Sequence, residues 1–311
     1  MSQTRREFLK NTITTTAGIA FLSSNTSLLY SCSNGKLFNI SLAEWSLHNA
    51  LFGKEMDNLE FPEVALKEYG IKAVEYVSTF FKDTTEKYLG ELLLRSKDND
   101  VRNVLIMIDG EGNLGDVNEE ERLKAVNNHH KWIDAAKYLG CHSIRVNARG
   151  EGTAEEVAKA AIEGLGKLTE YGEKDEINVI VENHGGYSSD GKWLSNVISQ
   201  VNNKYCGTLP DFGNFCIEAE RTEEGWNCVK EYDRYLGMEE LMPYAKGVSA
   251  KSYDFDAEGN ETQMDFHRIM KTIKNSGYKG YVGIEYEGKR LSEKEGILAT
   301  KSLLERVFQE I

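Results

Sequence analysis

The feature that most constrains the fold of this chain is a helical segment that ends at a glycine and is followed directly by a short apolar run. Gly70, Gly140 and Gly277 each end such a segment, and they precede the runs IKAVEYV, CHSIRVN and YKGYVGIEYEG. A glycine just past a helix adopts the left-handed conformation that closes it, so each one indicates a helix-to-strand junction. The repeated unit predicts alternating helices and strands.

Further apolar runs bring the number of expected strands to eight, at residues 37–47, 101–109, 177–183, 205–212 and 245–253. A continuous apolar run rich in β-branched residues is typical of a parallel strand covered on both faces. Amphipathic patterns such as residues 62–69 and 154–171 predict the intervening helices. The chain is therefore expected to be an α/β protein with a single (β/α)8 TIM barrel over residues 37–311. An open doubly wound sheet is the alternative, although no glycine-rich phosphate motif follows the first strand.

Residues 1–31 are predicted to be an export signal rather than part of the barrel. The segment TRREFLK at residues 4–10 resembles a twin-arginine signal, and LYSC at residues 29–32 resembles a lipoprotein box ending at Cys32. The intervening apolar stretch is shorter than the ~20 residues that a membrane span needs. We expect a periplasmic protein that contacts the membrane only through a lipid on Cys32. An unmodified cysteine is the alternative, because Tyr30 is bulky for a lipoprotein box.

The charge of the chain limits its partners. A net charge of −13 and a pI of about 5.1 argue against nucleic-acid binding, which needs a basic surface. A small neutral or metal-complexed substrate is easier to reconcile with this charge. The cysteines Cys141, Cys206, Cys216 and Cys228 lack metal-type spacing, and we expect mostly buried thiols because a chain of this length does not need disulfides.

Polar residues gather where the expected strands end, and in a TIM barrel the chemistry lies at the carboxyl ends of the strands. Side chains two apart on a strand share a face, so Glu285 and Glu287 are expected to point together. So many carboxylates would raise one another's pKa values unless a hard divalent cation such as Mg2+ or Mn2+ balanced them. In chain order these residues are Glu44, Trp45, His48, Glu75, Asp109, Arg145, Asn147, Glu182, His184, Asp211, Asn214, Ser249, Lys251, Glu285 and Glu287.

Four of these strand ends resemble those of the xylose-isomerase-like sugar isomerase/epimerase barrels. They are Glu182 after the fifth expected strand, Asp211 in LPDFGN, Ser-Ala-Lys at 249–251, and Glu285 in GYVGIEYEG. In that family a Glu, an Asp, a His and a second Glu hold one divalent metal ion, and the two glutamates act as acid and base. The resemblance therefore implies that Glu182, Asp211 and Glu285 are metal ligands, with Mn2+, Mg2+ or a similar ion as the cofactor.

The chain departs from the family at two positions. Ser249 stands where the family has the histidine of a His-x-Lys motif, and Asn214 stands where relatives often carry histidine. A serine hydroxyl is a poorer ligand than imidazole, which puts the affinity and the identity of the metal in doubt.

The resemblance implies an enzyme that removes a proton next to the carbonyl of an unphosphorylated sugar or keto-sugar. Return of the proton to the same carbon gives an epimerase, and return to the neighbouring carbon gives an isomerase. A keto-glycoside lyase or hydratase is the first alternative, and a non-catalytic sugar-binding lipoprotein is the second. The catalytic candidates are Glu182, Glu285, Lys251 and His184, and the substrate-binding candidates are Trp45, His48, Glu75, Arg145, Asn147, Asn214 and Glu287.

We do not expect the other histidines to take part in the chemistry. His129 and His130 lie in a helical segment rich in Asn and Lys and are expected to be solvated, whereas His142 and His267 are expected to be structural. The related metal-dependent abasic-site endonucleases need many histidines for several zinc ions, so six histidines and a net negative charge argue against that function.

Overall fold

A computed structural model describes residues 38–223 and 225–311. The twin-arginine motif and Cys32 lie outside the described residues, so the export signal stays a prediction. From residue 38 onward the chain forms one compact α/β unit. Among the described helices, none combines the length and the apolar character that crossing a membrane requires.

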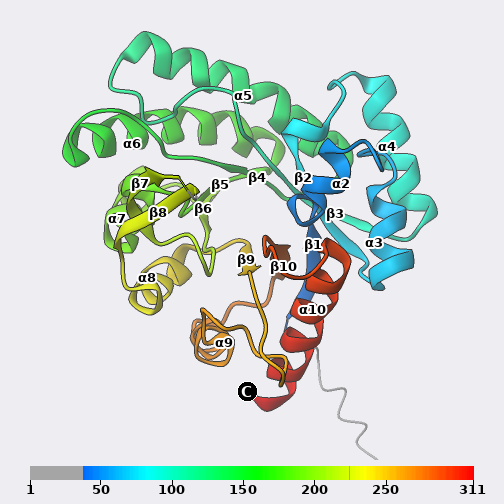
Figure 1. The fold of residues 1–311 in the computed structure, drawn as a ribbon. Helices are drawn as coiled ribbons and strands as arrows, with labels where there is room; N and C mark the ends of the chain where they lie inside the picture. Colours follow the sequence, from blue (N-terminus) through cyan, green and yellow to red (C-terminus); the bar gives the residue numbers. More distant parts are fainter. Residues whose placement is uncertain (1–37, 224) are drawn as a thin grey trace, which may run out of the picture. The chain divides into compact units, whose positions relative to one another are not determined.

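Eight parallel strands curl into a barrel (Figure 1). Their order in the sheet is β6-β5-β4-β3-β2-β1-β10-β9, and every neighbouring pair is parallel. The two edges meet through parallel bridges from Thr208 to Ala245 and from Asp211 to Ser249. The prediction of eight strands and a single TIM barrel is confirmed. The strands are β1 (Asn39–Ala43), β2 (Ala73–Val77), β3 (Arg102–Met107), β4 (Ser143–Val146), β5 (Asn178–Glu182), β6 (Cys206–Leu209), β9 (Val248–Ser252) and β10 (Tyr281–Tyr286).

Helices cover the outer face of the curled sheet (Figure 1). Gly70 and Gly140 follow α3 and α5 with φ angles of 65° and 75°, which confirms them as left-handed helix ends. The helices are α2 (His48–Phe52), α3 (Phe61–Tyr69), α4 (Glu86–Asp98), α5 (Glu119–Leu139), α6 (Ala154–Gly172), α7 (Gly191–Val201), α8 (Arg234–Leu241), α9 (Phe266–Asn275) and α10 (Glu293–Glu310).

The strand residues face alternately outward and inward, and the inward face positions the site. Outward side chains pack with the helices in the large core, whereas Ala43, Val77, Ile180 and Leu209 belong to a smaller cluster. Glu182 lies two residues beyond Ile180 and therefore shares its face of β5. The same alternation places polar residues at the strand ends, above the apolar side chains of this smaller cluster.

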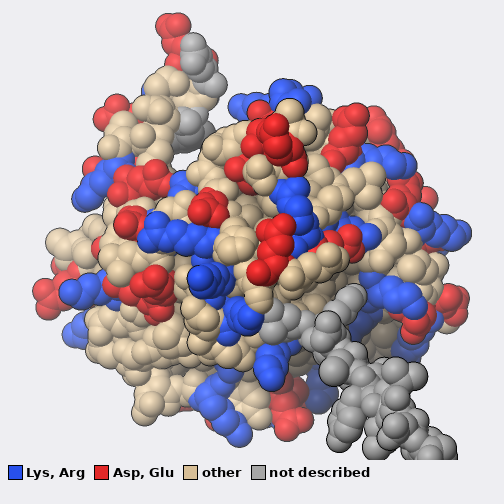
Figure 2. All heavy atoms as spheres, turned by 90° about the horizontal axis from the view of Figure 1, so that it is seen from below, with Lys and Arg blue, Asp and Glu red and all other residues tan. Residues whose placement is uncertain are grey.

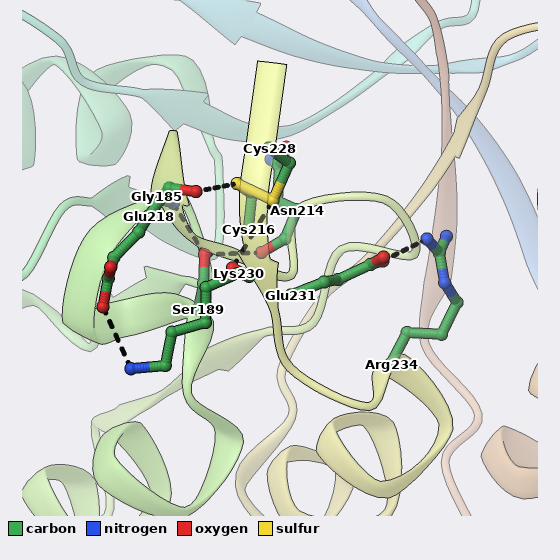
Figure 3. Close-up of a disulfide and its surroundings, with 9 residues drawn as sticks. All are labelled: Gly185, Ser189, Asn214, Cys216, Glu218, Cys228, Lys230, Glu231 and Arg234. Atoms are coloured by element: carbon green, nitrogen blue, oxygen red, sulfur yellow. Dashed lines mark hydrogen bonds and ion pairs between the residues drawn. A yellow bond between two sulfur atoms is a disulfide. The ribbon is translucent and has the colours of Figure 1, made fainter. Parts of the chain in front are cut away.

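A disulfide-linked hairpin between β6 and α8 was not expected from the sequence. Strands β7 (Cys216–Thr222) and β8 (Gly225–Glu231) are antiparallel, and Cys216 bonds to Cys228 (Figure 3). The expectation of buried thiols is correct for Cys141 and Cys206, which are free and buried, and wrong for the other two. Cys216 and Cys228 are only partly buried or exposed on this hairpin, where a thiol gains little from burial.

Charged side chains of both signs are interspersed over the face shown in Figure 2.

Candidate active site

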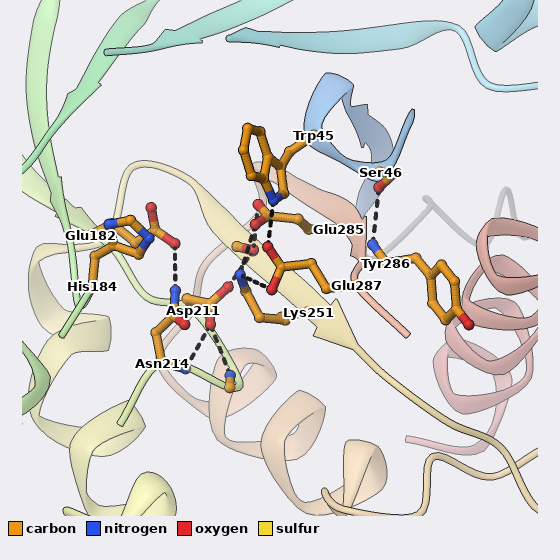
Figure 4. Close-up of polar contacts among 12 residues, drawn as sticks. Trp45, Ser46, Glu182, His184, Asp211, Asn214, Lys251, Glu285, Tyr286 and Glu287 are labelled. Atoms are coloured by element: carbon orange, nitrogen blue, oxygen red, sulfur yellow. Dashed lines mark hydrogen bonds and ion pairs between the residues drawn. The ribbon is translucent and has the colours of Figure 1, made fainter. Parts of the chain in front are cut away.

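Five ionisable side chains converge at the carboxyl ends of β5, β6, β9 and β10. Glu182, Asp211, Lys251, Glu285 and Glu287 point toward one another inside the barrel (Figure 4). The first four are at most 3% exposed, because each lies on an inward-facing position with the sheet around it. Four carboxylates and one ammonium group thus share a space that is largely shielded from water.

Three of the carboxylates form a compact triad. One oxygen from each of Glu182, Asp211 and Glu285 lies within 4.8 Å of the others. Burial, opposed by Arg145 and reinforced by Glu285, raises the pKa of Glu182 to about 8. Burial also raises the pKa of Asp211 to about 6 in spite of the nearby Lys251. The chain's own cations therefore only partly compensate the negative charge of the triad.

Lys251 is the main cation on one side of the triad. Its Nζ lies 2.8 Å from Glu285 Oε1 and 3.1 Å from Glu287 Oε2. Burial alone would lower the pKa of Lys251, but the surrounding carboxylates raise it well above its ordinary value. Trp45 Nε1 also donates a hydrogen bond to Glu287. Lys251 therefore stays charged and, with Trp45, fixes the orientation of Glu287.

Arg145 is the cation on the other side. Its Nε lies 2.7 Å from Glu182 Oε2, and its Nη1 lies 3.2 Å from Asp109 Oδ1. The Nε–H group is not aligned with Glu182, so the buried Oε2 atom has no hydrogen-bond donor. The other oxygen, Oε1, accepts a hydrogen bond of 3.0 Å from Asn214 Nδ2. Glu182 Oε2 is thus ion-paired with Arg145 but accepts no hydrogen bond.

Ser249 occupies the position where a histidine ligand was expected from the family resemblance. Its hydroxyl donates to Asp211 Oδ2 at 2.6 Å and lies 3.4 Å from Glu285 Oε2. Asp211 Oδ1 accepts from the backbone N–H groups of Gly213 and Asn214. Three carboxylates, with one buried oxygen that lacks a donor, are the ligand set of a hard divalent cation. The triad fits such an ion even without the histidine.

A row of polar side chains forms the wall beside the triad. His184 Nδ1 lies 3.0 Å from Asn147 Oδ1 and 3.1 Å from Arg149 Nη2. Asn147 in turn donates to Asp109 Oδ1 at 2.9 Å. Burial, together with the charges of Arg145, Lys251 and Arg149, lowers the pKa of His184 to about 3. His184 is therefore a neutral imidazole at physiological pH and can exchange hydrogen bonds with a substrate.

A cavity of about 510 Å³ opens onto these groups. Of the candidates from the sequence it is lined by Trp45, Arg145, Asn147, His184, Glu285 and Glu287, together with Asp109. Glu182, Asp211, Asn214 and Lys251 are in direct contact with this set but do not line the cavity. The structure therefore assembles one continuous site from seven strand ends.

Two candidates lie elsewhere. Glu75 is buried deeper in the barrel, where it accepts a hydrogen bond from Ser41 Oγ and fills the space left by the missing side chain of Gly283. Burial raises its pKa to about 7. His48 donates through Nδ1 to the backbone oxygen of Trp45 at 2.7 Å and stacks on the Trp45 ring. His48 thus supports Trp45 from behind and does not line the cavity.

The cavity also contains residues that were not identified from the sequence, namely Thr79, Glu111, His129 and Arg149. The expectation that His129 is solvated is wrong, since it is 3% exposed and its ring nitrogen Nδ1 lies 2.7 Å from Ala125 O. Helical spacing could have indicated this, because Ala125, Trp132 and Ile133 are also buried on the same face of α5.

Comparisons with known proteins agree with the barrel. A family model described as xylose isomerase-like TIM barrel matches residues 64–307. Over 77 residues the chain is 39% identical to the C-glycoside deglycosidase alpha subunit of Arthrobacter globiformis, a match covering 23% of this chain and 22% of that subunit. The match therefore spans about a fifth of that relative's length.

Solved structures share the fold at low sequence identity. A D-tagatose 3-epimerase-like protein has a TM-score of 0.67 at 16% identity, covering 88% of this chain and 98% of that one. The 3-keto-D-glucoside 4-epimerase of E. coli has a TM-score of 0.61 at 14% identity, covering 87% and 99%. A xylose isomerase-like TIM-barrel protein from Mycobacterium smegmatis, in complex with magnesium, has a TM-score of 0.64 at 15% identity, covering 88% and 96%.

The Lys251→Met substitution is expected to lower the free energy of unfolding by about 3–5 kcal/mol, because it leaves two buried carboxylates without their cation. Urea denaturation measures this change. Lys246→Met is the matched control, since Lys246 is half-buried near the start of β9 and forms no ion pair among the described residues. Equal losses in the two variants would show that Lys251 does not hold the carboxylates.

Addition of Mn2+ or Mg2+ to metal-stripped protein is expected to stabilise it, by about 2.7 kcal/mol at a hundredfold excess over the dissociation constant. Thermal unfolding with and without the ion measures the effect. Asp211→Asn should abolish the stabilisation, whereas Asp109→Asn, outside the triad, should retain it. An absence of stabilisation by either ion, or an unchanged response in Asp211→Asn, would contradict a metal site at the triad.

Proposed function

We propose that this chain, which belongs to the xylose isomerase-like TIM-barrel family, removes a proton next to the carbonyl of an unphosphorylated sugar or keto-sugar. The observation that carries the proposal is the placement of two buried glutamates, Glu182 and Glu285, on separate strands beside one cavity. An acid and a base at separate positions can act on a substrate from two directions. The product is an epimer or an isomer of the sugar.

The environment of Glu182 suits a group that exchanges protons near neutral pH. A pKa of about 8 lies close to physiological pH, where a general acid or base is most effective. Its Oε2 atom accepts no hydrogen bond, although it lies 2.7 Å from Arg145 Nε. Glu285 differs, since Lys251 donates to one of its oxygens at 2.8 Å. The two carboxyl groups thus have different hydrogen-bond partners.

A divalent cation held by Glu182, Asp211 and Glu285 supplies, when bound, positive charge that stabilises the negative charge developing on the substrate oxygens. The chain's own residues orient the sugar. Neutral His184 exchanges a hydrogen bond with a substrate hydroxyl or carbonyl, and Trp45, a cavity-lining aromatic, packs against the apolar face of the ring.

The arginines at the site support an unphosphorylated substrate. Arg145 is already bound to Glu182 and Asp109, and Arg149 contacts the backbone oxygen of His184 at 3.0 Å. The Arg145 guanidinium group, which already pairs with two carboxylates, is thus poorly placed to make the bidentate contacts with which arginine recognises a phosphate. The names of the structural relatives, which include sugar epimerases, also support a small carbohydrate.

Elimination from a keto-glycoside, or addition of water to the resulting product, is the second candidate reaction. It is favoured by the partial similarity to a C-glycoside deglycosidase subunit and by the shared fold with a 3-keto-D-glucoside 4-epimerase. Both reactions begin with the same proton abstraction, so the same glutamates would serve them.

Exchange of solvent deuterium into candidate sugars tests the proposal. Glu182→Gln and Glu285→Gln should each slow the exchange by ~100-fold or more, because each removes an acid or base. Glu44→Gln is the matched control, since Glu44 is a fully buried carboxyl group outside the cavity whose pKa is also raised to about 8. The mass of the product then distinguishes the reactions. Isomerisation leaves the mass unchanged, whereas addition of water or loss of an aglycone changes it.

The proposal fails if the wild-type protein binds a sugar but exchanges no proton with any aldo- or keto-sugar. That result would identify a sugar-binding protein instead.

We also propose that the protein is exported and anchored by a lipid on Cys32, on the basis of residues 4–10 and 29–32. Cys32→Ser is expected to move the protein from the membrane fraction to the soluble periplasmic fraction. Replacement of both Arg5 and Arg6 by lysine should instead retain it in the cytoplasm. An unchanged distribution of both variants would contradict the twin-arginine and lipoprotein predictions.

A further inference from the structure

A second cavity, of about 740 Å³, adjoins the first. Asn113, Arg149 and His184 line both cavities, so these three side chains form the boundary between them. Neither Glu285 nor Glu287 lines the second cavity, which therefore extends from His184 away from the triad. The site is longer than the part that holds the acid–base groups.

The floor of the second cavity is backbone rather than side chain. Gly185 and Gly186 line it directly after His184, with φ angles of 83° and 61°. A β-carbon at either position would meet no protein atom within 4 Å. The two glycines therefore leave an open surface on which a flat group can lie.

Two large apolar side chains, Tyr187 and Ile217, line the second cavity among polar ones. Tyr187 is held by a 2.9 Å hydrogen bond from its hydroxyl to Gly152 O and by stacking on Trp193. Ile217 lies opposite on the β7–β8 hairpin, next to the Cys216–Cys228 disulfide that links the two strands. An aromatic ring and a branched aliphatic side chain are typical contacts for an aromatic ligand.

The hairpin is also tied to the loop after β5. Ser189 Oγ donates to the backbone oxygen of Asn214 at 2.8 Å, beside the hairpin's first strand (Figure 3). Asn183 Nδ2 donates to the same oxygen at 3.1 Å. Asn214 itself contacts Glu182, so the wall of the second cavity and the triad share one support. The second cavity is therefore a built part of the site.

The first cavity is large enough to hold a single sugar, so such a substrate would not need the second cavity. A cavity of about 510 Å³ lies within the ~300–1,000 Å³ that accommodates a whole drug-sized ligand, and a monosaccharide is smaller than that. A second cavity continuous with the first is expected only if the substrate extends beyond the sugar ring.

We propose that the second cavity binds the aglycone of a glycoside, and that this aglycone is an uncharged aromatic group. Glu151 and Glu218 outnumber Arg149 among the charged lining residues and disfavour an anionic group, while Tyr187 and Ile217 favour a flat apolar one. This inference rests on the proposed function, and it narrows the substrate of that reaction to a keto-glycoside whose sugar occupies the first cavity, because a glycoside without a ketone has no carbonyl beside which a proton can be removed. His184 then lies where the sugar meets its substituent.

Calorimetric titration with pairs of methyl and phenyl glycosides of the same sugar tests the inference, with a panel of hexoses and their keto forms as the sugars. The phenyl glycoside is expected to bind about tenfold more tightly than the methyl glycoside. Ile217→Ala should reduce this preference to about threefold or less while leaving methyl glycoside affinity unchanged. The Cys216→Ser/Cys228→Ser double variant should reduce it as well.

Val229→Ala is the matched control, because it shortens an aliphatic side chain on the same hairpin that is 48% exposed and outside the cavity. It should retain the full preference. Equal affinities within every pair would overturn the inference. Binding of free sugars without binding of any glycoside would do the same. In both cases deuterium exchange would still be observed. Failure of the proposed function would look different, because the preference for the phenyl glycoside would be preserved but no proton exchange would be observed.

Discussion

The structure depends on the burial of more carboxylates than cations at one end of a closed barrel. Glu182, Asp211 and Glu285 lie within contact of one another and are almost completely shielded from water. Lys251 and Arg145 offset part of their charge, and neither reaches all three. Desolvation of an uncompensated carboxylate is expensive, so this arrangement persists only if protons or a bound cation supply the rest. Affinity for cations and affinity for protons are thus two consequences of the same burial.

The barrel makes this arrangement possible because it fixes several strand ends at once. Inward and outward positions alternate along each strand, so an apolar residue such as Ile180 beneath the site anchors Glu182 above it. Hydrogen bonds from Ser249 to Asp211 and from Asn214 to Glu182 then set the orientation of the carboxyl groups. Ser249 and Asn214, where the family resemblance would place histidines, therefore hold the acidic side chains in place.

The sequence was informative where local pattern and global fold coincide. The apolar runs and helix-ending glycines predicted all eight barrel strands, and the strand-end rule predicted the triad. Prediction from the sequence failed where the position of a residue along the chain does not determine how deep in the barrel its side chain lies. Glu75 ends a strand-like run, yet β2 continues to Val77 and leaves its side chain below the cavity. The hairpin could not be predicted, because CIEAERT is polar and exposed, and a separation of 12 residues gives no sign of the disulfide.

We infer that the buried triad, which includes the two glutamates, binds a divalent cation. X-ray diffraction at the manganese absorption edge, from crystals grown with Mn2+, tests it most directly. We expect one anomalous peak enclosed by carboxylate oxygens of Glu182, Asp211 and Glu285, with Ser249 still hydrogen-bonded to Asp211. A peak at another position, or none at saturating Mn2+, would contradict the claim and would leave protons alone to neutralise the cluster.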